Sequence, residues 1–252
     1  MGRVARSLAA PLLLLIIWEL ACRLLHVKAA LLPPPSQVAR KLVEYAASGE
    51  LPSDAAATLF RVLVGFAIGA GLALPLGLWM GASRRVHEFL NPLIQLVRPI
   101  PPIAFIPLAI LWLGLGNPPA FFLIALGAFF PVLMNTIAGV RGVDAIYVRA
   151  AQNLGAGSSI LFRRVLLPAA MPAILSGLRI GVGVAFIVVI VAEMIAVNSG
   201  LGYRILEARE YFWSDKIIAG MISIGVLGLC IDAGMARMNA RLLRWHRGIE
   251  LG

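Results

Sequence analysis

Long apolar runs alternate with short polar segments along most of this chain, and the runs have the length that crosses a lipid bilayer. A transmembrane helix needs about 20 predominantly apolar residues. Six segments meet or approach that length, so the pattern predicts an all-α membrane protein with six transmembrane helices in one domain, residues 1–252, with a core at about 55–240. The predicted spans are Ala9–Leu25, Val62–Gly81, Leu93–Leu115, Ala120–Ala138, Ala173–Val197 and Ile217–Met235.

Prolines interrupt this pattern in two places. Arg98, Pro99, Pro101 and Pro102 stand at the beginning of the third span. Because proline removes a backbone donor and clashes with the preceding turn, we expect this span to be kinked or to start late. The segment 26–58 contains three consecutive prolines, after which we expect a short surface helix with Ser36 as its N-cap.

Basic residues are distributed unevenly between the polar segments that join the spans. With the N-terminus inside, 14 of the 22 lysines and arginines fall on the cytoplasmic side and the other 8 on the outer side. Cytoplasmic loops carry an excess of positive charge, so both termini are predicted to be cytoplasmic. The cytoplasmic set is Arg3, Arg6, Arg84, Arg85, Arg98, Arg141, Arg149, Arg163, Arg164, Arg179, Arg237, Arg241, Arg244 and Arg247.

The composition agrees with a membrane protein. Hydrophobic residues make up 60% of the chain and charged residues 13%, whereas soluble domains are nearer half apolar and a quarter charged. The net charge of +10 is scattered between apolar runs and builds no basic surface, so no nucleic-acid partner is expected. Cys22 and Cys230 lie inside apolar segments, where they are expected to be small core residues.

Neither a catalytic site nor a metal site is predicted. The three histidines, His26, His87 and His246, lie far apart along the chain. The nucleotide-binding pattern G-x-x-x-x-G-K-[ST] is absent, so we expect no ATP hydrolysis by this chain and no cofactor of its own.

A polar segment between the fourth and fifth spans has a distinctive pattern. The stretch RAAQNLGAGSSILFRRVLLP, residues 149–168, lies in the loop 141–172, the longest loop on the predicted cytoplasmic side. Asp144 is placed to cap a first short helix that Gly155 ends, and a second helix is expected from Ser158 to Pro168. One side of the second helix is apolar, and Arg163 and Arg164 make the other side basic. Such a pair could dock in a groove on a cytosolic partner or rest on lipid.

The segment resembles the EAA loop of permease subunits in bacterial binding-protein-dependent ABC importers. That pattern is E-A-A, three residues, G, nine residues and I-x-L-P. Here the alanines are Ala150 and Ala151, the glycine is Gly155, and the final motif is occupied by Val165, Leu166, Leu167 and Pro168. The family's glutamate is replaced by Arg149, an inversion of charge that suggests a partner surface adapted to a cation.

The resemblance extends over most of the chain. Segments such as LPPPSQV, RPIPPIAFIPLAILWLGLG and GLRIGVGVAFIVVIVAEMIAVNSGLGYRI are similar to the branch that handles aliphatic sulfonates, taurine, nitrate or bicarbonate. Relatives of that branch carry vitamin precursors, riboflavin or aromatic acids, so the substrate stays open. The resemblance implies the type I ABC importer permease fold in a bacterial inner membrane.

The same resemblance implies a set of partners. They are a second copy of the chain, two ABC ATPase subunits that bind ATP and magnesium in the cytoplasm, an extracytoplasmic substrate-binding protein and membrane lipid. The loop 149–168 would transmit ATPase closure to the membrane helices, through Arg149, Ala150, Ala151, Gly155, Arg163, Arg164, Val165, Leu167 and Pro168. A self-sufficient secondary carrier or channel is the rival class, but the central charged relay and inverted repeats typical of that class are not evident.

Glu193 lies near the outer end of the fifth span, where an ionised carboxylate requires protein or water around it. It could act in a gate, together with Asn198, Gly200 and Gly202 in the segment NSGLGY. Alternatively, it could be a buried anchor for neighbouring backbone amides, which we favour because a fixed anion suits an anionic pathway poorly.

Two further features of the spans have competing interpretations. Arg179 could attract anions, but we favour a side chain that snorkels to the lipid headgroups. Asp232 is expected to pair with Arg237 or Arg141. The glycine-rich strings Gly65–Gly77 and Ser176–Ala185 predict close helix packing, with contact between copies as the more specific alternative.

Overall fold

The computed structural model describes residues 2–243, with side chains from residue 9 onward, and every element assigned in that part is a helix. Arg244, His246 and Arg247 lie outside the described residues, as do the side chains of Arg3 and Arg6. The elements are α1 (Gly2–Leu24), α2 (Pro35–Ala47), α3 (Glu50–Ala82), α4 (Arg84–Val97), η1 (Pro102–Phe105), α5 (Ile106–Leu113), α6 (Asn117–Arg141), α7 (Ala145–Asn153), α8 (Ser158–Leu161), η2 (Phe162–Leu166), α9 (Leu167–Ala196), α10 (Leu201–Glu210) and α11 (Ser214–Leu242).

Four helices of the described chain are long and apolar enough to cross a membrane: Glu50–Ala82, Asn117–Arg141, Ser158–Ala196 and Ser214–Leu242. A fifth crossing is possible through α4 and the segment Pro102–Leu113, which are bent by 79° relative to each other. The third predicted span, Leu93–Leu115, is interrupted as expected, because the prolines at 99, 101 and 102 break the helix after Val97. The count of six spans and the cytoplasmic termini stay predictions.

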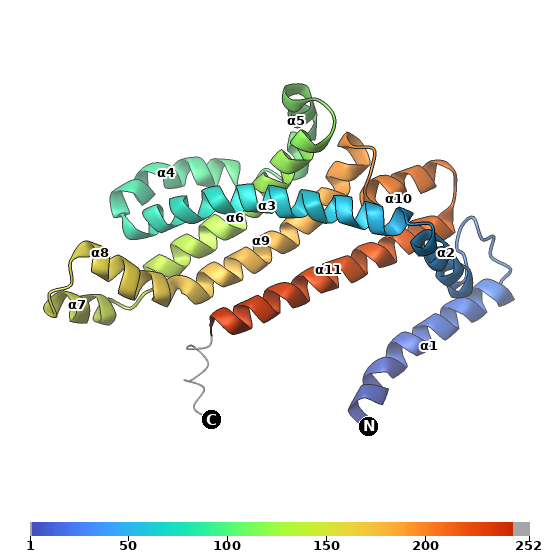
Figure 1. Cartoon of the computed structure of the whole chain (residues 1–252), viewed down its shortest axis with the longest axis horizontal. Coiled ribbons are helices and arrows are strands. Elements are labelled where there is room, and N and C mark those ends of the chain that lie inside the picture. Colours follow the sequence, from blue (N-terminus) through green and yellow to red (C-terminus); the bar gives the residue numbers. More distant parts are fainter. Residues whose placement is uncertain (1, 244–252) are drawn as a thin grey trace.

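The centre of the bundle is formed by α3, α6 and α9, with α6 packed against both of the others (Figure 1). Glycines allow this contact: a Cβ atom on Gly69 would lie 3.0 Å from the Cα atom of Ala125 in α6. On α9, a Cβ atom on Gly177 would lie 2.6 Å from Asn135 Cβ. The two glycine-rich strings thus pack within the chain, as the first interpretation predicted.

The fifth predicted span is part of a longer helix. The chain is helical from Ser158 to Ala196 without interruption, so the expectation that Pro168 ends a short helix is wrong. A π-helical turn at Phe162–Leu166 ends two residues before Pro168, and Leu167 N–H donates to the carbonyl of Phe162. The wider turn accommodates a residue that has no N–H to donate.

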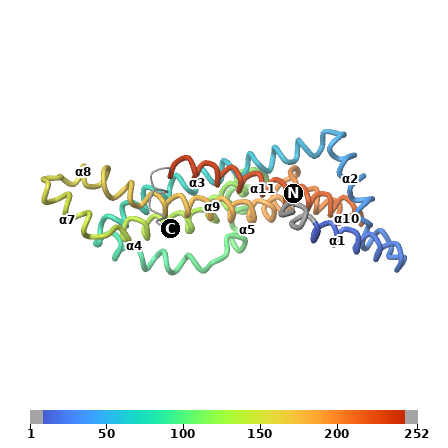
Figure 2. The backbone as a smooth tube through the Cα atoms, turned by 90° about the horizontal axis from the view of Figure 1, so that it is seen from below, coloured from blue at the N-terminus to red at the C-terminus, as the bar shows by residue number. Residues whose placement is uncertain are grey.

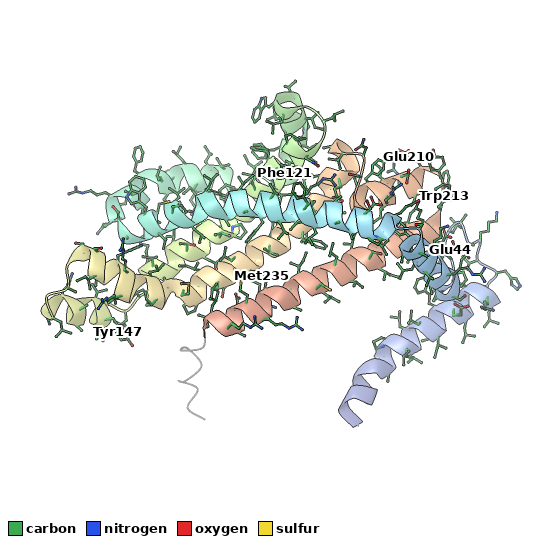
Figure 3. All side chains as sticks on the ribbon, viewed as in Figure 1. Glu44, Phe121, Tyr147, Glu210, Trp213 and Met235 are labelled. Atoms are coloured by element: carbon green, nitrogen blue, oxygen red, sulfur yellow. The ribbon has the colours of Figure 1, made fainter. Side chains whose placement is uncertain are left out.

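The loop 141–172, with α7 and α8, lies at one end of the bundle, and α2 and α10 lie at the opposite end (Figures 1 and 2). Among the labelled side chains, Tyr147 marks the first end, and Glu210 and Trp213 mark the second (Figure 3). α9 runs between the two ends, which makes it the continuous connection from the loop to α10.

Helix α1 leaves the bundle beside α2 (Figure 1). Ser36 lies inside the first turn of α2, where its N–H and its Oγ donate to the carboxylate of Glu19 at 3.0 and 2.9 Å. The prediction that Ser36 is the N-cap is wrong, because Pro34 occupies that position and Pro35 starts the helix. Proline suits the first helical position, where no backbone donor is needed.

Candidate functional site

A buried polar cluster occupies the α2–α10 end of the bundle. Three of its members, Asp54, Thr58 and Arg61, follow each other on α3 at spacings of four and three residues. This spacing places them on one face of a helix. That face is turned into the protein, since none of the three is more than 4% exposed.

Glu193 of α9 meets this face. Its carboxylate is completely buried, and its Oε1 accepts a hydrogen bond from Arg61 Nη1 at 2.7 Å. Its Oε2 accepts from Thr58 Oγ1 at 2.9 Å. A buried ion pair is stable only when its remaining hydrogen-bonding groups are satisfied. Arg61 meets that condition through bonds to Asn117 Oδ1 and to the carbonyl and hydroxyl oxygens of Ser199, at 2.7 to 2.8 Å.

The cluster also holds the beginning of α10. The N–H groups of Gly200, Leu201 and Gly202 donate to Asp54 Oδ1, Thr58 Oγ1 and Glu193 Oε2, at 2.9, 3.0 and 2.9 Å. The first N–H groups of a helix have no partner within it, so side-chain acceptors stabilise its start. Three consecutive donors are satisfied here by side chains from two other helices.

Asp54 also connects α2 and the body of α10 to the cluster. Asp54 Oδ2 accepts from Tyr45 Oη and from Arg204 Nε, both at 2.7 Å. Burial, and next the hydrogen bond to Asp54, raise the pKa of Tyr45 above its ordinary value, so the phenol stays a donor. Burial lowers the pKa of Arg204, but its hydrogen bonds to Asp54 and Glu207 outweigh that effect and raise it.

Three of the four candidate gate residues come together in this cluster. Gly200 has a φ of +104°, and a Cβ atom there would lie 2.5 Å from the carboxylate carbon of Glu193. Gly202 is buried against the same side chain. Asn198 is exposed and lines a separate hollow of about 340 Å³ with Gly116 and Ile195. Glu193 has the contacts of an anchor, and a role in gating stays a prediction.

The sequence-based prediction did not find Asp54, Thr58 and Arg61. Asp54 and Thr58 lie in the segment 26–58, and Arg61 precedes the predicted start of the second span at Val62. The signal in the sequence was the spacing of these polar residues, four and then three positions apart. This spacing places them on the buried face of α3, in line with the buried residues of the second span. Their burial depends on Glu193, more than 130 residues further along the chain.

The loop 141–172 contains the predicted helix–glycine–helix arrangement. Asp144 Oδ1 accepts from the N–H of Ile146 at 2.9 Å, which is the predicted cap of α7. α7 ends at Asn153, and Gly155 follows with a φ of +81°, a conformation that glycine adopts without strain. α8 then begins at Ser158, as predicted.

The predicted partner-binding residues lie along this loop with different exposures. Arg149, Ala150, Gly155, Arg163 and Arg164 are exposed, and Ala151, Val165, Leu167 and Pro168 are half-buried. Ile160, on the apolar side predicted for the second helix, is exposed, but sequence reasoning missed the rest of the apolar tip, where Ile146, Tyr147 and Leu154 are also exposed, Leu154 by 89%. Exposed apolar side chains grouped at the end of a bundle are typical of an interaction surface.

The charged residues Arg179 and Asp232 lie in the spans and form a pair that was not predicted. Arg179 Nε and Nη2 donate to the two carboxylate oxygens of Asp232 at 2.8 and 2.7 Å. The expectation that Asp232 pairs with Arg237 or Arg141 is therefore wrong. Arg179 also does not snorkel as a single charge, because its guanidinium reaches across to α11.

Comparison with known proteins identifies similar chains. The family model described as "Binding-protein-dependent transport system inner membrane component" matches residues 73–244. The aliphatic sulfonates transport permease protein SsuC of Bacillus subtilis is 38% identical over 97% of this chain and 89% of its own length. The taurine transport system permease protein TauC of Escherichia coli is 36% identical over 98% and 92%. The nitrate import permease protein NrtB of Synechocystis is 32% identical over 94% and 89%.

The fold itself has a solved counterpart. A chain of the MetNI methionine ABC transporter, in an inward-facing conformation, superimposes with a TM-score of 0.67 at 18% sequence identity. The match covers 78% of this chain and 98% of that chain.

Proposed function

Because the chain belongs to the family of binding-protein-dependent transport system inner membrane components, we propose that it is the membrane-spanning subunit of an ATP-driven importer for small anions. The observation that carries this proposal is the similarity, over nearly its full length, to permeases named for sulfonates, taurine and nitrate. The chain is an inner membrane protein. In the proposal it contains no catalytic site and takes its energy from a separate ATPase.

The proposed assembly contains two copies of this chain, two ATPase subunits in the cytoplasm and a binding protein outside. The loop 141–172 is suited to the ATPase contact, because its exposed tip combines apolar side chains with Arg149, Arg163 and Arg164. Six spans with both termini in the cytoplasm would place this loop inside and the buried polar cluster at the outer surface.

The continuous helix Ser158–Ala196 supports a mechanical route through the membrane. It contains 39 residues, which corresponds to about 58 Å at 1.5 Å per residue. One end begins directly after Gly155 and Gly157 in the loop, and the other contains Glu193. A displacement of α8 by a closing ATPase would therefore move the anchor of α10 without passing through a flexible joint.

In this mechanism the buried polar cluster keeps the outer end of each subunit rigid. Glu193, Asp54 and Thr58 hold the first turn of α10, so that α3, α9 and α10 move together. ATP binding would bring the loops of the two copies together and open the outer side to the binding protein. Hydrolysis would return the assembly to the inward-facing state, which gives alternating access.

Transport by the reconstituted complex tests this function. The chain, its ATPase and its binding protein are placed in proteoliposomes, and ATP-dependent uptake of taurine, an alkanesulfonate, nitrate and bicarbonate is measured. A thermal-shift screen of the binding protein against the same anions, thiamine precursors and riboflavin selects the substrate. Binding of a vitamin precursor alone would overturn the anion class, and uptake that persists without the ATPase would favour a secondary carrier.

A cysteine at Gly155 is expected to crosslink to the ATPase. The substitution Gly155→Cys is made with Cys230→Ser, since Cys230 is exposed and Cys22 is buried. Gly49→Cys is the matched control: its φ is +80°, it is equally open, and it lies at the opposite end of the bundle. A bifunctional thiol reagent should join the Gly155→Cys variant, but not the Gly49→Cys variant, to the ATPase. Equal yields for both variants, or no product with the ATPase for the Gly155→Cys variant, would contradict the proposed coupling.

A further inference from the structure

The ion pair between Arg179 and Asp232 joins α9 to α11 without belonging to the buried polar cluster. Both side chains are about half exposed in the single chain, Arg179 by 47% and Asp232 by 55%. Their contact is bidentate, with two hydrogen bonds of 2.8 and 2.7 Å.

The pair lies inside two of the predicted spans, Ala173–Val197 and Ile217–Met235. Arg179 is 17 residues from the end of α9 at Ala196, and Asp232 is 18 residues from the start of α11 at Ser214. At 1.5 Å per residue these separations are about 26 and 27 Å, so both residues lie toward the loop end of spans that need about 30 Å. The pair is therefore in the part of the membrane that is nearer to the loop 141–172.

Charged side chains at this depth face the interior of an assembly or a water-filled path, because exposure to lipid is costly. The exposed halves of Arg179 and Asp232 thus mark the side of α9 and α11 that is turned away from the acyl chains. Space is available on these helices: a Cβ atom on Gly183, one turn from Arg179, would meet no atom within 4 Å. The same holds for Gly225 of α11, two turns before Asp232.

We propose that Arg179 is an anion-binding group of the translocation path and that Asp232 is the resident counter-ion which the substrate displaces. The inference rests on the proposed function. A guanidinium presents two donors in a plane and matches the paired oxygens of a carboxylate, a sulfonate or nitrate equally well. The carboxylate of Asp232 occupies the place that such an oxyanion would take.

The counter-ion explains how the site can be stable when it is empty and still hold the substrate only briefly. When the path is empty, Asp232 neutralises Arg179, so no uncompensated charge remains in the membrane. When an oxyanion enters, the two hydrogen bonds are exchanged for two of the same geometry, and the carboxylate is free to turn toward water. Asp232 then competes for the guanidinium again and favours release, as a transport path requires of its binding sites.

The test uses the complete complex in proteoliposomes and the anion that the wild-type complex transports best. The double variant Arg179→Gln/Asp232→Asn removes both charges without leaving either unpaired. The matched control, Arg84→Gln/Glu88→Gln, removes an exposed ion pair on α4. We expect uptake to fall at least about 10-fold in the first variant, as for the loss of hydrogen bonds to a charged group, and to stay unchanged in the control. ATP hydrolysis stimulated by the loaded binding protein should fall less than uptake.

Further variants separate binding from structure. Arg179→Lys keeps the charge but loses the two coplanar donors of the guanidinium, so uptake should lie between that of the wild type and that of the double variant. For Arg179→Cys with Cys230→Ser, a charged methanethiosulfonate reagent should react from water, and the transported anion should slow the reaction. This labelling does not require an active transporter, so it remains informative if substitution impairs coupling.

Unchanged uptake in the neutral double variant would overturn the proposal. So would labelling of the Arg179→Cys variant by a membrane-soluble maleimide alone, or protection by anionic lipid and not by the transported anion, which would assign the oxyanion to a lipid headgroup. A wild-type complex that transports none of the anions would instead overturn the proposed substrate class.

Discussion

Replacing Glu193 by alanine is expected to destabilise the folded chain by about 3–5 kcal/mol, the usual consequence of removing one partner of a buried ion pair. The Arg61 guanidinium would remain, 4% exposed, without its counter-ion. The N–H of Gly202 would also lose its acceptor. Glu193→Gln should be milder, because the amide oxygen can still accept from Gly202, while the charge and the acceptor for Arg61 Nη1 are lost.

The measurement is thermal or chemical unfolding in detergent, followed through the tryptophan fluorescence. A double-mutant cycle with Arg61→Ala isolates the energy of the pair, since the double variant leaves no charge unpaired. Glu88→Ala is the control, because it removes a partner from an exposed pair on α4 and should change the stability far less. Equal effects of Glu193→Ala and Glu88→Ala would contradict the anchoring role.

The same variants examine the proposed gate. If Glu193 positions α10, coupled transport by Glu193→Gln should decrease even at temperatures where the protein remains folded. Wild-type uptake and ATP hydrolysis in Glu193→Gln would show that the carboxylate stabilises the fold without contributing to gating.

Gly69→Ala is expected to destabilise the bundle strongly, although it adds only one methyl group. The added Cβ would meet the backbone of Ala125, including its carbonyl oxygen, and backbone atoms of a packed helix cannot turn aside. Overpacking of a close contact costs about 1–3 kcal/mol and occasionally more. The gain in helix propensity on replacing glycine by alanine, up to about 1 kcal/mol, is too small to compensate.

Gly71→Ala is the matched control for this prediction. It lies two residues away on the same helix, and its Cβ would meet nothing within 4 Å. The apparent melting temperature in detergent should decrease for Gly69→Ala and stay equal or increase for Gly71→Ala. A decrease of the same size in both variants would mean that helix propensity, and not the α3–α6 contact, sets the effect.

Local patterns predicted a large part of this protein. Apolar length identified α6 and α11 as membrane-spanning helices, because each has the required length and hydropathy in its own sequence. Asp144 and Gly155 correctly marked the two ends of the first short helix in the loop 141–172, and Ser158 marked the start of the second, since caps and left-handed turns depend on neighbouring residues. Where local rules compete, the prediction failed: a π-helical turn lets the chain pass Pro168, which by itself would end a helix.

The sequence by itself determined which segments are apolar enough for the membrane, where the first short helix of the loop begins and ends, where the second begins, and the family to which the pattern is similar. Only the tertiary structure decided which charges meet. Arg61 with Glu193, and Arg179 with Asp232, are joined across 132 and 53 residues of chain. A hydrophobicity pattern indicates the burial of one segment at a time. The partner of a charge depends instead on the rotation and register of two packed helices, and the contacts of the whole bundle determine both.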